Sequence, residues 1–152
     1  AALAKIYFAL SGDAAKVGGV WPALGVNEPL LDHLPLPEPF PDWMSEDELQ
    51  TFAETFAQTG FRGPFNRYRN IDTDYHALPD YGVKAISQPS AFIAGALDPV
   101  RTFVPGRDAY ESAGELLGDL RELTIIEGAG HWIQQERPQQ VTSALLAFLK
   151  GL

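Results

Sequence analysis

The part of the chain after residue 84 alternates between short apolar runs and amphipathic stretches, and this alternation most restricts the fold. Residues 90–94 (SAFIA) and 123–126 (LTII) are predicted to be buried strands, because each is apolar and a glycine follows within two residues. We predict a helix near 106–117 between them and a last helix that begins near Pro138. Strand, helix, strand and helix in this order indicate parallel strands with right-handed crossovers, and therefore an α/β fold.

The N-terminal part of the chain has a different character. Residues 1–10 are predicted to be the end of a helix, and six prolines between residues 18 and 42 predict a long loop. The clearest helix covers residues 45–58, where apolar side chains recur on one face. Ser45 is its predicted N-cap, and Glu48 three residues later completes a capping box.

Composition excludes several classes of protein. A net charge of −9 argues against nucleic-acid binding, because such a protein presents a basic surface to the phosphates. The chain has no cysteine, which excludes disulfides, thiolate nucleophiles and cysteine-based zinc sites. No apolar run approaches the roughly 18–20 residues of a membrane helix. No signal peptide is visible, and we expect a cytoplasmic protein. The only methionine is Met44, which suggests that the natural protein begins upstream of Ala1.

Two titratable residues directly follow the predicted strands. Asp98 comes after the first strand and His131 after the second, so both are expected at the carboxyl edge of the sheet, where ligands bind in parallel sheets. A carboxylate that accepts a hydrogen bond from one imidazole nitrogen stabilises the imidazolium that forms when the other nitrogen takes a proton. Asp98 and His131 are therefore candidates for the acid and base of a nucleophile–histidine–acid triad. Spacing alone also allows a structural role, with Asp98 opening a turn at Pro99.

Three segments resemble a known family. Residues 128–138 (GAGHWIQQERP) look like the histidine loop of α/β-hydrolases, and residues 93–100 (IAGALDPV) resemble the acid loop of the same superfamily. Residues 60–70 (GFRGPFNRYRN) resemble the cap segment of α/β-hydrolase epoxide hydrolases that carries a catalytic tyrosine, which by this match is Tyr68. The alternative for Tyr68 is a tyrosine that only packs the cap against the core.

The resemblance implies the C-terminal part of an α/β-hydrolase fold with a partial helical cap. Residues 1–83 would form the cap and its return to the core, and residues 84–152 the C-terminal part of the core. A nucleophile in this superfamily needs Gly-x-Ser-x-Gly or its aspartate counterpart at a strand-to-helix turn, and no serine here has glycine on both sides at that spacing. The nearest aspartate match, around Asp108, ends in Tyr110 instead of glycine. We therefore predict that residues 1–152 alone have no hydrolase activity.

The implied reaction is the hydrolysis of a small apolar or aromatic epoxide to a vicinal diol, with no metal or organic cofactor. An aspartate outside this chain would attack the epoxide and form a covalent ester, while Tyr68 stabilises the departing oxygen. His131, oriented by Asp98, would then activate water to release the diol. The expected partner is the N-terminal half of the same protein, which carries the nucleophile, and a homodimer is a further expectation.

Two alternatives stay open. A haloalkane or haloacid dehalogenase, or another α/β-hydrolase such as an esterase, would share His131 and an acid but would not need the hydroxyl of Tyr68. A non-catalytic binding module could also retain this scaffold. His33 and His76 have no partners at ligand spacing, so we predict structural or solvated roles for them and no metal site.

Overall fold

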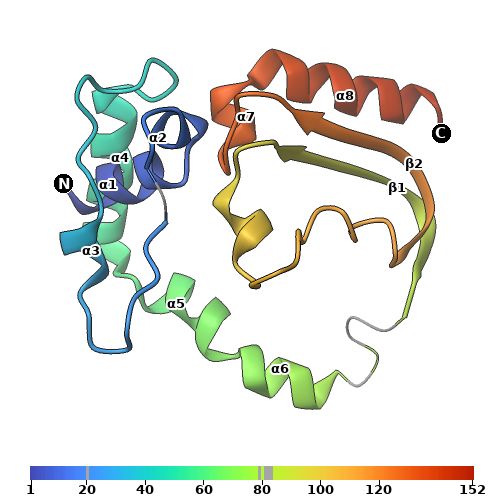
Figure 1. Cartoon of the computed structure of the whole chain (residues 1–152), viewed down its shortest axis with the longest axis horizontal. Helices are drawn as coiled ribbons and strands as arrows, with labels where there is room; N and C mark the ends of the chain where they lie inside the picture. The colour runs from blue at the N-terminus through green and yellow to red at the C-terminus, as the bar shows by residue number, and fades with distance from the viewer. Residues whose placement is uncertain (20, 79, 81–83) are drawn as a thin grey trace.

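The computed structural model describes residues 1–19, 21–78, 80 and 84–152. Helices form the N-terminal part, and two strands with a C-terminal helix form the other part (Figure 1). The elements in chain order are α1 (Ala2–Ala9), α2 (Gly12–Lys16), α3 (Leu30–His33), α4 (Glu46–Thr59), α5 (Arg62–Arg69), α6 (Ile71–Ala77), β1 (Ile86–Gly95), the 3-10 helix η1 (Pro99–Thr102), β2 (Leu117–Ile126), α7 (Ile133–Glu136) and α8 (Pro138–Lys150).

The N-terminal helices follow the predicted pattern with one addition. The helix predicted at residues 45–58 is confirmed as α4, and Ser45 and Glu48 form the expected capping box. The helix predicted to end near residue 10 is confirmed as α1, but a second helix starts at once. The hydroxyl of Ser11 accepts a hydrogen bond from the N–H of Ala14 and caps α2. Within its described residues, the proline-rich loop contains only one helix, the single turn α3.

The two predicted strands are confirmed as β1 and β2, and they pair in parallel. The register places Phe92 opposite Leu123 and Gly95 opposite Ile126, so the carboxyl ends of both strands lie at the same edge. Helix α8 begins at Pro138, as predicted, and lies along this sheet (Figure 1). The arrangement is the expected α/β architecture.

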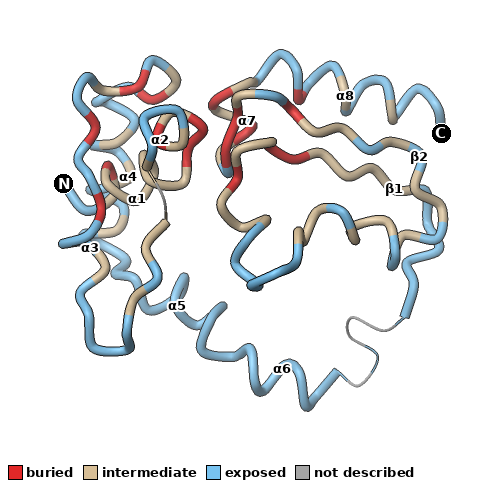
Figure 2. Tube along the Cα trace, viewed as in Figure 1, coloured by how far each residue is buried: buried red, intermediate tan, exposed pale blue. Residues whose placement is uncertain are grey.

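The core of this half lies at the carboxyl ends of the strands and is small. It consists of a cluster of side chains from β2, the loop after it, α7 and α8, with Ile93 packed against the cluster: Ile126, Ala129, Ile133 and Val141. The first four residues of β1, from Ile86 to Pro89, are exposed, and in β2 Leu123, only three residues before Ile126, is already 50% exposed. Figure 2 shows burial increasing along β1, whereas in β2 intermediate and exposed residues mix and only the last residue is buried. The prediction of buried strands is therefore correct only for their last residues, because few described elements cover this sheet.

The prediction of a helix near residues 106–117 is wrong, because this segment forms consecutive turns. Gly106 has a φ of 75°, which a right-handed helix does not accommodate. The carboxylate of Asp108 accepts the N–H of Tyr110 at 2.9 Å and also binds the guanidinium of Arg101. This local side-chain acceptor competes with the helical hydrogen-bond pattern, as is typical of aspartate near a turn.

Helices α5 and α6 are exposed along their whole length (Figure 2). Their main contacts are with each other. The proposed division of the chain at residues 83 and 84 falls where residue 83 lies outside the described residues, so that boundary stays a prediction. Within the described ranges, no helix has the length and the apolar content that a membrane span requires.

Candidate active site

Asp98 is held at the carboxyl end of β1 by the turn that the sequence predicts there. It is the N-cap of η1, and its Oδ1 accepts the N–H of Val100 at 2.9 Å. Pro99 follows at the first position of η1, where its missing N–H removes no hydrogen bond. This leaves Oδ2 of Asp98 available to other donors.

His131 follows β2 through a loop whose glycines allow close backbone packing. Gly128 has a φ of 70°, a left-handed conformation that glycine adopts without strain. The N–H of Leu97 donates to the carbonyl of Ala129 at 2.9 Å, which joins the loop after β1 to the loop after β2. The two loops therefore bring Asp98 and His131 together, as predicted.

The Asp98–His131 pair has the geometry of the back half of a triad. Asp98 Oδ2 lies 2.9 Å from His131 Nδ1, across 33 residues of sequence. The Asp98 side chain is 4% exposed and the His131 side chain 38%. No hydrogen bond of a described residue involves His131 Nε2. The pair thus fixes the ring through Nδ1 and leaves Nε2 available to take a proton.

The two pKa values reflect this contact. Burial raises the pKa of Asp98, but hydrogen bonds from His131, Tyr110 and the backbone outweigh burial and hold that pKa below its ordinary value. The hydrogen bond to Asp98 raises the pKa of His131 above its ordinary value, although burial opposes the shift. The negative charges of Asp98 and Glu136 add to the increase. His131 is therefore a stronger base than an isolated imidazole.

Tyr110 is a member of the site that the sequence did not predict. Its hydroxyl donates to Asp98 Oδ2 at 2.5 Å, the same oxygen that His131 contacts. Burial and the hydrogen bond to Asp98 raise the pKa of Tyr110 well above its usual range, so the phenol keeps its proton. The ring packs edge-on against Phe92 of β1. A tyrosine 12 residues beyond the acid carries no local signal for this contact, since only the turns between them create it.

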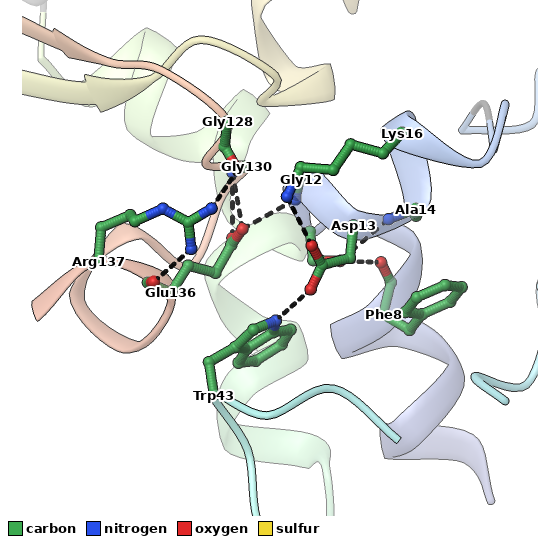
Figure 3. A network of polar contacts seen from close by, with 11 residues as sticks. Phe8, Gly12, Asp13, Ala14, Lys16, Trp43, Gly128, Gly130, Glu136 and Arg137 are labelled. Carbon is green, nitrogen blue, oxygen red and sulfur yellow. Dashed lines mark hydrogen bonds and ion pairs between the residues drawn. The ribbon is translucent and has the colours of Figure 1, made fainter. Parts of the chain in front are cut away.

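Glu136 is a second unpredicted member, and its carboxylate lies against Gly130 of the histidine loop (Figure 3). Its carboxylate is buried and accepts backbone N–H groups from Gly12, Gly130 and Trp132. Glu136 belongs to the segment that resembles the histidine loop, but no sequence pattern distinguishes it from an exposed glutamate at the end of α7. Its partner Gly12 is 124 residues away in sequence.

Tyr68 is the predicted site residue that the structure does not bring to the pair. It lies on α5 and is 70% exposed. Among the described residues, no hydrogen bond involves its hydroxyl. A catalytic role for Tyr68 therefore stays a prediction.

The two other histidines that the sequence analysis considered, His33 and His76, are both exposed. His33 ends α3, and His76 lies on α6. Across the described ranges, no three or more acidic or histidine side chains are grouped as metal ligands.

Trp132 connects the histidine loop to α1. Its ring stacks on Tyr7 with ring centroids 4.4 Å apart, and its indole N–H donates to the Tyr7 carbonyl, which fixes α1 beside the histidine loop.

Comparison with known proteins places this geometry among epoxide hydrolases. No protein-family model matches the chain. Epoxide hydrolase A of Mycobacterium tuberculosis is 43% identical over 159 residues, which cover 94% of this chain and 48% of that protein. An epoxide hydrolase from an endophytic Streptomyces has a TM-score of 0.83 at 36% identity and covers 99% of this chain and 45% of that one. The crystal structure of Epoxide Hydrolase A from Mycobacterium thermoresistibile has a TM-score of 0.79 at 37% identity, with the same coverage. The chain spans less than half the length of each of these proteins.

Proposed function

Since this chain belongs to the α/β-hydrolase-fold epoxide hydrolases and matches their C-terminal portion, we propose that it supplies the acid, the base and a cap tyrosine for the hydrolysis of an epoxide to a vicinal diol. The observation that carries the proposal is the Asp98–His131 pair, whose Nδ1 contact leaves Nε2 available as a base. The proposed substrates are small apolar or aromatic epoxides.

The proposed reaction has two steps that balance as the addition of water to the epoxide. A carboxylate oxygen on a segment outside this chain forms a bond to an epoxide carbon, the carbon–oxygen bond of the ring breaks, and the ring oxygen takes the charge. Tyr68 donates a hydrogen bond and then a proton to that oxygen. His131 Nε2 next takes a proton from water, and the resulting hydroxide attacks the ester carbonyl. The diol leaves, the carboxylate is restored, and the proton on His131 returns to the tyrosine.

The exposed surface supports a second segment that covers this chain. The chain exposes 10507 Å², whereas a compact monomer of 16.6 kDa exposes about 7,600 Å². Part of the excess lies on α8, where Leu145, Leu146 and Leu149 are each 44–58% exposed. An apolar surface of this kind is typical of a contact with further protein. We propose that the nucleophile-bearing half of the same protein is that partner, and residues 1–152 alone are therefore expected to lack hydrolase activity.

Substitution of Tyr68 by phenylalanine tests the reaction in a full-length protein that contains this chain and the nucleophile segment. Loss of the hydroxyl removes the proton donor for the departing oxygen, so we expect kcat/KM for an aromatic epoxide to fall by roughly 10²–10⁴-fold. Tyr75→Phe is the matched control, because Tyr75 is also 70% exposed and lies on the adjacent helix α6. Its kcat/KM should stay within about twofold of the wild type.

The same variant separates the proposed reaction from dehalogenation. Displacement of a halide does not need a proton donor, so a dehalogenase should tolerate Tyr68→Phe on its own substrate. Unchanged epoxide opening in Tyr68→Phe, or measurable turnover by residues 1–152 alone, contradicts the proposal. A homodimer and a cytoplasmic location stay predictions, which sedimentation of the purified protein and cell fractionation would test.

A further inference from the structure

The backbone of His131 is held on both sides by consecutive hydrogen bonds. The N–H of Gly130 donates to Glu136 at 3.0 Å, and the N–H of Trp132 donates to Glu136 Oε1 at 3.2 Å. Between them, the N–H of His131 itself donates to the carbonyl of Leu10 at 2.9 Å. Three successive amides of the histidine loop are thus fixed by two groups, the Glu136 carboxylate and the Leu10 carbonyl.

The same carboxylate connects the loop to the N-terminal helices. Glu136 Oε2 accepts the N–H of Gly12, the first residue of α2, at 2.9 Å (Figure 3). The approach depends on small residues, since a Cβ on Gly12 would lie 2.5 Å from the carbonyl oxygen of Gly128. The turn between α1 and α2 and the histidine loop therefore meet backbone to backbone, with the carboxylate between them.

Glu136 lacks the ion pair that usually accompanies a buried carboxylate. It is 5% exposed, and among the described residues no cation lies within 4.0 Å of its oxygens. The adjacent Arg137 guanidinium donates to the carbonyls of Gly128 and Glu136 instead. Because burial of an unpaired charge is costly, the compensation here comes from the three charge-assisted N–H donors. A carboxylate at this site is best explained by the backbone that it holds.

We propose that Glu136 is a positioning residue for His131, which acts by fixing the amides on either side of the base and by joining them to α2. This inference rests on the proposed function of His131 as the base. We call the hydrogen bonds from Gly12, Gly130 and Trp132 to Glu136 the Glu136 clamp. Its loss should let the imidazole move away from Asp98, and a displacement of about 1 Å can reduce catalysis by about 10²-fold.

Glu136→Gln tests the clamp, because it keeps the size of the side chain and removes one acceptor and the charge. NMR of the full-length protein that contains this chain reports the Nδ1–H resonance of His131 and the hydrogen exchange of the Gly12, Gly130 and Trp132 amides. We expect a shifted or broadened Nδ1–H signal and about tenfold faster exchange at these amides, since one of the two oxygens no longer accepts and the bonds to the other lose their charge assistance. Glu127→Gln is the matched control, because it removes an equal charge from an exposed residue of the same loop.

Kinetics of the full-length protein give a second readout. Slower ester hydrolysis lowers kcat and KM together and leaves kcat/KM for epoxide opening nearly unchanged, whereas partial unfolding lowers kcat without changing KM. We expect a fall of roughly 10-fold in both constants for Glu136→Gln. If Glu136→Gln does not fold, Glu136→Asp keeps the charge and should loosen the same amides.

Two outcomes overturn the inference: a His131 Nδ1–H signal and amide exchange identical to those of the wild type, or equal changes in Glu136→Gln and Glu127→Gln. A failure of the proposed function is distinguishable. In that case Glu136→Gln alters the His131 resonance, while the full-length wild-type protein does not hydrolyse epoxides.

Discussion

The hydroxyl of Tyr110 donates a 2.5 Å hydrogen bond to Asp98, and it uses the carboxylate oxygen that also contacts the imidazole of His131. One oxygen therefore serves two donors. Each donor stabilises the charged carboxylate, which agrees with the lowered pKa of Asp98. Because both donors use Oδ2, the hydrogen bond from Tyr110 weakens the interaction of that oxygen with His131. That interaction is the one that raises the pKa of the imidazole.

Replacement of Tyr110 by phenylalanine should make His131 a stronger base. Without the phenol, Oδ2 of Asp98 interacts with His131 alone, so the pKa of His131 rises further above its ordinary value. NMR titration of the imidazole measures this change directly. Loss of a hydrogen bond to a charged group should also lower the free energy of unfolding by about 1.5–3 kcal/mol. An unchanged or lower pKa of His131 would show that Tyr110 does not compete for the carboxylate, and Tyr75→Phe on α6 is the control.

The Asp98–His131 pair predicts a specific dependence of stability on pH. The pKa of His131 is raised in the folded protein, so its contribution is full below about pH 6.5, the unfolded value, and is lost as pH rises through the folded pKa. The pKa of Asp98 is lowered, so its contribution is full above about pH 3.9 and is lost as pH falls through the folded pKa. The pair should therefore stabilise the protein most between these limits.

Urea unfolding at a series of pH values tests this window. The difference in the free energy of unfolding between the wild type and His131→Gln should be largest between about pH 3.9 and 6.5 and should decrease on either side. His76→Gln, at an exposed position on α6, is the control and should show no such maximum. A difference that grows steadily into the alkaline range would mean that His131 is not stabilised in its charged form.

The close contact between the histidine loop and the turn after α1 predicts a large effect of one methyl group. A Cβ on Gly130 would lie 2.5 Å from the carbonyl oxygen of Leu10, and that backbone has little room to move. Gly130→Ala should therefore lower the free energy of unfolding by about 2–3 kcal/mol. Gly63 on α5 faces open space, so Gly63→Ala should be neutral or stabilise the helix by up to about 1 kcal/mol. Thermal unfolding compares the two variants, and equal midpoints would contradict the packing.

Local sequence patterns were sufficient to predict the helices whose ends depend on interactions between residues close in sequence. The capping box of Ser45 and Glu48 and the proline that starts α8 act within one helical turn, and both helices begin where predicted. The placement of Asp98 and His131 follows from strand order alone, because consecutive parallel strands end at one edge. Their contact was therefore predictable without knowledge of the rest of the molecule.

The unpredicted features depend on contacts between distant segments or on side-chain competition. The apolar spacing around Tyr110 indicated a helix, but the carboxylate of Asp108 bound Arg101 and the Tyr110 amide and stabilised turns instead. Nothing local to Glu136 indicates that its carboxylate is buried, since the Gly12 amide that it accepts belongs to another part of the chain. The role of Tyr68 was assigned from resemblance to a family. The described contacts of α5 in this structure do not test that role.

The central claim is that His131 activates water for the hydrolysis of a covalent ester. The most direct test is the mass of a full-length His131→Gln protein after incubation with an aromatic epoxide. We predict a stable mass increase equal to that of the epoxide, located on an aspartate outside residues 1–152, with little diol released. Turnover of His131→Gln at the wild-type rate, or an absence of any adduct while the wild type remains active, would contradict the claim.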